Sequence, residues 1–205
     1  MQFEKSHPEL APTRGRFLEA DLAYGHHGSL HAARVMFWRA FLVQHLPETQ
    51  QQALLPIVLA AASLHDTRRL DDTEDELHGQ TAANAHREAL ARVLTDPSSL
   101  DTCINAIQGH CVPDDKCPNM DMALQILKDT DALDRGRFGA PDKTGGCNTT
   151  LFRTPLLKSQ DPYRNICWMA YYTAQSSEYT PWGDTPCTDF AKCLAEAVIH
   201  AKDLG

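Results

Sequence analysis

The stretch from Gln50 to His65 constrains the fold more strongly than any other part of the sequence. It is rich in alanine and leucine, and its apolar side chains would lie on most sides of a helix instead of along one stripe. Such a helix needs other elements around it, because it offers water no polar face. The stretch therefore predicts the central helix of a bundle, with Pro56 in its first turns.

Apolar side chains also recur at three- and four-residue steps elsewhere in the chain, which is the spacing of helices. From His31 to Leu46 they define a helix that Ser29 is expected to cap and that Pro47 ends. Ser98 or Ser99 is expected to cap another helix. The same spacing predicts further helices over residues 79–94, 99–110, 120–133, 163–176 and 188–202. No stretch alternates apolar and polar residues as a strand does, so we predict an all-α fold.

Residues 136–161 are dense in glycine, proline, asparagine and threonine, which is typical of a loop. Loops of this length often serve as lids or binding loops. The whole chain has 205 residues and a mass of 22.8 kDa, a size that fits a single domain with a substantial core of its own.

Charge and hydropathy argue against some classes of function. The formal net charge is -8 and 22% of the residues are charged, which disfavours a broad nucleic-acid surface but leaves room for basic groups that hold one phosphate. No apolar run approaches the roughly 18 residues that span a bilayer, and residues 1–16 lack a secretory pattern. We therefore expect a soluble cytoplasmic protein without a membrane partner.

The 7 cysteines are odd in number and irregular in spacing, which fits free thiols in a reducing compartment better than a disulfide framework. One spacing occurs twice, C-x5-C, at Cys111/Cys117 and Cys187/Cys193. It is wider than the two- to four-residue gaps of structural zinc sites, so these pairs are not expected to hold zinc.

Four residues with metal-binding side chains lie at the edges of helix-like stretches: His31, the adjacent pair His65 and Asp66, and Asp131. Divalent transition metals favour imidazole nitrogen and carboxylate oxygen, and a helical bundle could bring all four side chains together in its core. Spacing alone carries little weight in a chain with 10 histidines and 27 acidic residues, so local context has to decide.

The context of these residues resembles the HD superfamily of metal-dependent phosphohydrolases. The run Ala60–Asp66 ends an apolar helix on the His-Asp pair, and Lys128–Arg135 places the final aspartate near a helix end. The runs His27–Val35 and Leu77–Ala83 are also similar to segments of HD domains. The resemblance covers about residues 24–139, a little over half of the chain.

The resemblance implies both a fold and an activity. The fold is an all-α HD-domain helical bundle, a single HD-like domain over residues 1–205 with its core at about 24–139 and a C-terminal helical extension with the long loop 136–161. The activity is that of a metal-dependent phosphohydrolase or phosphodiesterase acting on a nucleotide or another small phosphate ester. The cofactor would be one or two divalent ions (Mn, Fe, Co, Ni or Zn), with the metal ligands His31, His65, Asp66 and Asp131.

His78 and His110 lie between the His-Asp pair and the final aspartate, where some HD enzymes carry extra histidines and hold a second metal. Together with Asp66 they are candidate catalytic residues, and they could bind a second ion or a phosphate oxygen. The alternative is that both histidines are surface polar residues near loop ends.

Cations near these ligands are candidates for binding the substrate phosphate. Arg34 follows the first histidine ligand by three residues and Lys128 precedes the final aspartate by three, so each shares a helix face with a ligand. Arg69 comes shortly after the His-Asp pair. As alternatives, Arg34 could form an ion pair with a helix-end acid such as Asp134, and Arg69 could be a solvated loop charge.

Two further charged groups lie near the expected site. The acidic run at residues 71–76 could supply a side chain that orients water or protonates a leaving oxygen, or it could be a solvated face. Arg135 and Arg137 lie beside the glycine-rich segment and could close over a substrate.

His27 adds a narrower resemblance. The run H-G-x-x-H-A-x-R-V that begins at His27 is similar to the phosphodiesterase domains of SidE-type effectors, in which histidines and a glutamate act without a retained metal. His27 is therefore a candidate substrate-binding residue, although the complete set of metal ligands argues for a metal. Further alternatives are a di-iron HD oxygenase and a non-catalytic nucleotide-binding HD module.

Overall fold

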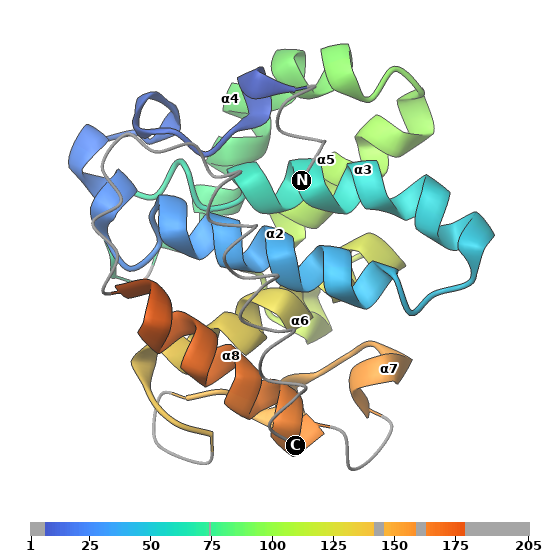
Figure 1. The fold of residues 1–205 in the computed structure, drawn as a ribbon. Coiled ribbons are helices and arrows are strands. Elements are labelled where there is room, and N and C mark those ends of the chain that lie inside the picture. Colours follow the sequence, from blue (N-terminus) through green and yellow to red (C-terminus); the bar gives the residue numbers. More distant parts are fainter. Residues whose placement is uncertain (1–6, 74, 142–145, 159–162, 179–205) are drawn as a thin grey trace.

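The computed structural model describes residues 7–73, 75–141, 146–158 and 163–178 of the chain. Within these ranges the chain forms helices, turns and no strand, which confirms the all-α prediction (Figure 1). The α-helices are α2 (Ser29–Val43), α3 (Glu48–Leu64), α4 (His78–Val93), α5 (Pro97–Gly109), α6 (Met122–Asp134), α7 (Pro155–Lys158) and α8 (Tyr163–Glu178). Short 3₁₀ helices cover Pro8–Leu10, Arg14–Arg16, Ala20–Tyr24, Asp114–Lys116, Arg135–Phe138 and Thr149–Leu151. The helix predicted over residues 188–202 lies outside the described residues.

Helix α3 packs against α2, α4, α5 and α6, as expected for the central helix of the bundle. Its second half is enclosed, since every residue from Ile57 to Leu64 is buried. Pro56 stands just before this buried half, in the middle of the helix and not in its first turns, because α3 already begins after Pro47. The first half of α3 is mostly exposed, so it tolerates the loss of the backbone hydrogen bond that proline cannot donate.

Gly28 and Asp96, and not the predicted serines, occupy the N-cap positions of α2 and α5. Asp96 caps α5 by accepting from the Ser99 N–H at 2.8 Å, and Pro97 fills the first helical position, where no N–H is needed. Asp121 caps α6 by accepting from the Leu124 N–H at 2.9 Å. Before α2 the N-cap position belongs to Gly28, without a side-chain hydrogen bond.

The predicted loop over residues 136–161 is partly helical where the structure describes it. Phe152 and Leu157 are buried in the core, so this segment is anchored by its own apolar side chains. Asp129 on α6 adds a polar anchor, because its carboxylate accepts from the Thr154 N–H at 2.7 Å. The segment is therefore anchored to the core by Phe152 and Leu157 and to α6 at Thr154.

Gly136 allows α8 to lie directly against the end of α6, two elements that contact each other in the structure (Figure 1). A Cβ atom at this position would lie 2.8 Å from the backbone nitrogen of Tyr171. Only glycine permits so close an approach, and the approach fixes the 3₁₀ turn Arg135–Phe138 beside the C-terminal end of α6.

In the described part of the chain, no helix combines the length and the apolar character needed to cross a membrane.

His86 on α4 is buried, and we expect it to make the free energy of unfolding depend measurably on pH. Its Nε2 lies 2.8 Å from the Thr67 hydroxyl, which itself donates to the Leu64 carbonyl, so the imidazole has to donate. Burial, together with the nearby Arg68 and Arg16, lowers the pKa of His86 to about 4.

Because this pKa is lower in the folded than in the unfolded chain, the unfolded chain takes up the proton first as the pH falls. We expect His86 to cost the fold about 2 to 3 kcal/mol between pH 7.5 and 4.5. His86→Gln should remove that part of the pH dependence in urea unfolding, whereas His45→Gln, at an exposed histidine, should keep it. Equal slopes for both variants would contradict the assignment.

Candidate metal centre

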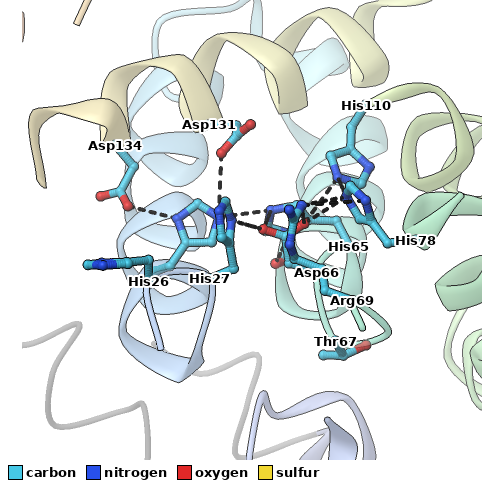
Figure 2. A network of polar contacts seen from close by, with 12 residues as sticks. His26, His27, His65, Asp66, Thr67, Arg69, His78, His110, Asp131 and Asp134 are labelled. Atoms are coloured by element: carbon cyan, nitrogen blue, oxygen red, sulfur yellow. Dashed lines mark hydrogen bonds and ion pairs between the residues drawn. The ribbon is translucent and has the colours of Figure 1, made fainter. Parts of the chain in front are cut away.

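Five helix ends converge on one place in the bundle (Figure 2). The side chains they carry are His31 in the first turn of α2, His65 and Asp66 directly after α3, His78 at the start of α4, His110 directly after α5 and Asp131 in the last turn of α6. The structure thus brings together all four predicted metal ligands and both additional histidines.

Asp66 lies between two groups of histidines, and each of its carboxylate oxygens faces a different group (Figure 2). Oδ2 lies 3.2 Å from His31 Nε2 and 3.6 Å from His65 Nε2. Oδ1 lies 3.0 Å from His78 Nε2 and 3.3 Å from His110 Nε2. One carboxylate therefore joins two sets of donor atoms.

We call the set that faces Oδ2 the first cluster and the set that faces Oδ1 the second cluster. The first cluster consists of Asp66 Oδ2, His31, His65 and Asp131, whose Oδ1 lies 3.4 Å from His31 Nε2. The second cluster consists of Asp66 Oδ1, His78 and His110. Within each cluster the Nε2 atoms of the two histidines face each other, at 3.1 Å in the first and 2.8 Å in the second.

The four histidines share one feature: the Nδ1 of each faces an oxygen that accepts a hydrogen bond. The pairs are His31 with Asp134 Oδ2 at 2.7 Å, His65 with the Ala62 carbonyl at 2.8 Å, His110 with the Ile107 carbonyl at 2.7 Å and His78 with the Asp75 carbonyl. Nδ1 must donate in each pair, so a neutral ring presents a lone pair at Nε2. The donor atoms therefore point lone pairs at one another and at a carboxylate, an arrangement that fits a metal cation between them.

The charges of the buried groups agree with this arrangement. Burial holds the pKa of His65 well below its ordinary value, so its ring is neutral. Burial opposes the charge of Asp66, but the surrounding histidines, His65 above all, hold the pKa of Asp66 well below its ordinary value. Burial and Arg137 lower the pKa of His31, but hydrogen bonds to Asp134 and Asp66 outweigh them and raise it. A proton on His31 therefore competes with a metal ion for the same lone pair.

Asp134 accepts a hydrogen bond from His31 on the side of the ring that faces away from the first cluster. The sequence suggested Asp134 only as an ion-pair partner for Arg34. It is fully buried and accepts from His31 Nδ1, from Arg34 Nη2 at 3.1 Å and from Arg137 Nη1 at 3.0 Å. Burial opposes its charge, but Arg34 above all holds the pKa of Asp134 well below its ordinary value. Its spacing of three residues from Asp131 puts both carboxylates on one face of α6, which is the signal that could have found it.

The predicted phosphate-binding cations lie in different places. Arg34 forms the ion pair with Asp134. Arg69 is buried at the second cluster, where Nη1 lies 3.3 Å from His78 Nε2 and 3.7 Å from Asp66 Oδ1. Lys128 is not brought to the clusters: its Nζ donates to the Val112 carbonyl and to Asp114 Oδ1, the latter at 3.0 Å. Its long side chain follows the loop after α5, although its position on α6 is close to that of the final aspartate.

His27 and Arg137 lie at the more exposed side of the first cluster. His27 Nδ1 is 2.8 Å from Asp66 Oδ2, and Arg137 Nη2 is 3.5 Å from the same nitrogen. Burial lowers the pKa of His27, although its side chain is still 20% exposed. The side chain of Asp131 is 36% exposed, whereas those of His31 and His65 are fully enclosed. Solvent therefore reaches the first cluster from the side of His27 and Asp131.

The described residues of the acidic run at 71–76 are engaged mainly with backbone. Asp72 accepts from the His26 and His27 N–H groups at 3.1 and 3.3 Å, and so it holds the turn that carries His27. Asp71 accepts from the Thr73 N–H at 2.7 Å, and Asp75 accepts from the Leu77 N–H at 3.1 Å. These carboxylates shape the loop beside the clusters, and Glu74 lies outside the described residues.

Asp134→Asn tests whether this residue orients His31. The substitution keeps the size of the side chain but replaces an accepting oxygen by an NH₂ group that cannot accept from His31 or an arginine. We expect metal affinity to fall about 10- to 100-fold, as for other lost partners of metal-bound histidines. We also expect the free energy of unfolding to fall by about 3 to 5 kcal/mol, because buried arginines lose their counter-ion.

Calorimetric titration with manganese and urea unfolding measure the two effects. Asp101→Asn, at a side chain that is 75% exposed, is the matched control and should change neither. Unaltered metal affinity in Asp134→Asn would show that Asp134 has no role at the first cluster.

The clusters offer imidazole nitrogen and carboxylate oxygen in buried, closely spaced positions, so the groups around Asp66 could hold a metal ion. The chain matches no family model, no curated protein and no solved structure.

Proposed function

We propose that this chain is a metal-dependent phosphohydrolase or phosphodiesterase of the HD type, which acts on a nucleotide or another small phosphate ester. The observation that carries the proposal is the position of Asp66, whose two oxygens face two clusters of histidine lone pairs. The local resemblance to HD domains supports the same chemistry.

The donor atoms fit two divalent ions that share Asp66. His31, His65, Asp66 Oδ2 and Asp131 would hold one ion. His78, His110 and Asp66 Oδ1 of the second cluster would hold the other ion, so the two ions would share the Asp66 carboxylate. Manganese, iron, cobalt, nickel and zinc all accept such nitrogen and oxygen ligands. When bound, a pair of such ions lowers the pKa of a water molecule and neutralises charge on the phosphoryl oxygens during an in-line displacement.

The protein side chains would orient the substrate from the solvent-exposed side of the first cluster. His27 donates from Nδ1 to Asp66, so the neutral ring carries a lone pair at Nε2, which would accept a hydrogen bond from a water molecule or a substrate hydroxyl. Arg137 and Arg69 add positive charge near the first and second cluster, respectively. Asp134 would keep His31 in the tautomer that binds metal and would hold Arg137 in place. Arg34 would act through its ion pair with Asp134 and not by direct contact with phosphate.

A di-iron oxygenase is the second candidate, and the second cluster is the observation that favours it. The same six side chains would hold two irons, since imidazole and carboxylate suit iron as well as manganese or zinc. Two irons per chain, a coloured protein and no phosphate release would select this candidate.

Asp66→Ala should remove both the metal and the hydrolysis. The bridging carboxylate is a ligand in both clusters, so its loss should lower turnover of a phosphate ester by more than about 100-fold, beyond the effect of losing a mere supporting group. The measurement is elemental analysis of the purified protein, followed by a phosphate-release screen over nucleotides with manganese, nickel or cobalt added.

Asp101→Ala, at the exposed acid on α5, is the control and should keep wild-type metal content and turnover. Circular dichroism should show that Asp66→Ala retains its helices, because the apolar core around α3 does not depend on the ion. Full activity in Asp66→Ala, or wild-type protein that binds no metal and releases no phosphate, would refute the proposed function.

A further inference from the structure

The second cluster has a neighbour that differs chemically from its imidazole and carboxylate groups. Cys111 directly follows His110, and its Sγ, one nitrogen of His78 and one nitrogen of His110 all lie within 4.8 Å of one another. A thiol in this position is part of the same group of potential ligands as the two imidazoles.

The packing of two helix ends brings the thiol there. The start of α4 and the end of α5 meet at Gly79, where a Cβ atom would lie 2.5 Å from the Ile107 carbonyl oxygen and 3.1 Å from Cys111 Sγ. Glycine at this position therefore leaves the space that the sulfur uses. The thiol donates to the Glu76 carbonyl at 3.4 Å, so Cys111 lies against the short segment that carries His78.

Among the residues that the structure describes, the second cluster otherwise contributes three protein donors. Their separations are 2.8 Å between His78 and His110 Nε2, and 3.0 and 3.3 Å from these atoms to Asp66 Oδ1. A tetrahedral ion with bonds of about 2.0 to 2.1 Å places neighbouring ligand atoms about 3.3 Å apart, so the two imidazoles would have to separate by about 0.5 Å to hold it. Tetrahedral coordination then needs a fourth ligand, and Cys111 is half-buried beside the two imidazoles.

We propose that Cys111 supplies this fourth ligand as a thiolate, which makes the second cluster a His₂-Asp-Cys site for zinc or cobalt. The inference rests on the proposed metal centre and adds a ligand and a metal preference to it. On binding, the S–H bond of Cys111 breaks, its proton leaves to solvent, and the sulfur–metal bond forms without any change of oxidation state. The side chain turns away from the Glu76 carbonyl, and the guanidinium of Arg69 yields its position near His78 Nε2 to the ion.

The two clusters would then differ in preference. The first offers only nitrogen and oxygen, with a partly exposed aspartate, and accepts manganese as readily as other divalent ions. The second includes a soft sulfur ligand, which favours zinc and cobalt over manganese. A protein supplied with manganese alone would therefore fill the first cluster and leave the second largely without metal.

Cobalt titration of the full-length protein, followed by absorption spectroscopy, tests the proposal. A thiolate bound to Co²⁺ gives a strong sulfur-to-metal charge-transfer band in the near ultraviolet, which nitrogen and oxygen ligands do not give. We expect this band in the wild type and its loss in Cys111→Ser, with cobalt at the second cluster bound at least about tenfold more weakly. Cys117→Ser is the matched control, because Cys117 is also half-buried and its Sγ donates to the Gly109 and Val112 carbonyls.

Zinc X-ray absorption of the wild type provides a test that needs no variant, since a bound Cys111 gives a sulfur neighbour at about 2.3 Å. Cobalt binding without the band, or a band that persists in Cys111→Ser, overturns the thiolate ligand and leaves the proposed hydrolase intact. Failure of the wild type to bind cobalt or zinc overturns the thiolate site, and failure to bind any divalent ion overturns the proposed hydrolase as well. Loss of the band in Cys117→Ser as well as Cys111→Ser would also contradict the assignment to Cys111.

Discussion

The ionised carboxylate of Asp66, buried among imidazoles, is the constraint that the arrangement of the surrounding helix ends has to satisfy. Its side chain is only 5% exposed, and a carboxylate removed from water is costly unless charges or hydrogen bonds compensate for it. Five helix ends supply that compensation, and each must be held within a fraction of an ångström of the same place. The enclosed half of α3 fixes the position of Asp66 itself, because this helix ends directly before the His65-Asp66 pair.

A second layer of charge surrounds the first. Asp66 is linked through His31 to Asp134, and Asp134 in turn accepts from Arg34 and Arg137. One imidazole therefore separates two buried carboxylates, and the outer carboxylate, Asp134, is paired with two arginines. Removing one member exposes the next to the full cost of burial, which makes the layer a unit and not a set of independent contacts.

Local patterns in the sequence predicted the helices of the described residues well and singled out the histidines and aspartates that lie together, because both signals come from residues close together in the chain. Gln50–His65 indicated a buried helix from its composition, and the context of the His65-Asp66 pair indicated ligands at its end. The caps depended on one hydrogen bond each, and Asp96 accepts from the Ser99 backbone where a serine cap was expected. The helices could thus be predicted from local composition, whereas the exact N-cap residue could not.

The remaining features of the site depend on contacts between distant residues. Lys128 shares a helix with Asp131, yet its length lets it reach Asp114, and no spacing rule says which way a long side chain turns. Cys111 looked like half of a C-x5-C pair, whereas its place beside His78 arises from the contact of two helix ends at Gly79. The arginines near the clusters were recognisable as charges, but their partners were not.

The construction of the cluster from separate helix ends has a consequence for how the proposed metal site would acquire an ion. The proposed ligands are spread from His31 to Asp131, so the unfolded chain holds no preformed site, and binding would have to follow assembly of most of the bundle. An ion that binds only the folded chain stabilises it, by about 2.7 kcal/mol when its free concentration is a hundred times its Kd. The metal content of the purified protein would then record which ions surround the finished fold, and not which ions were present while the chain was being made.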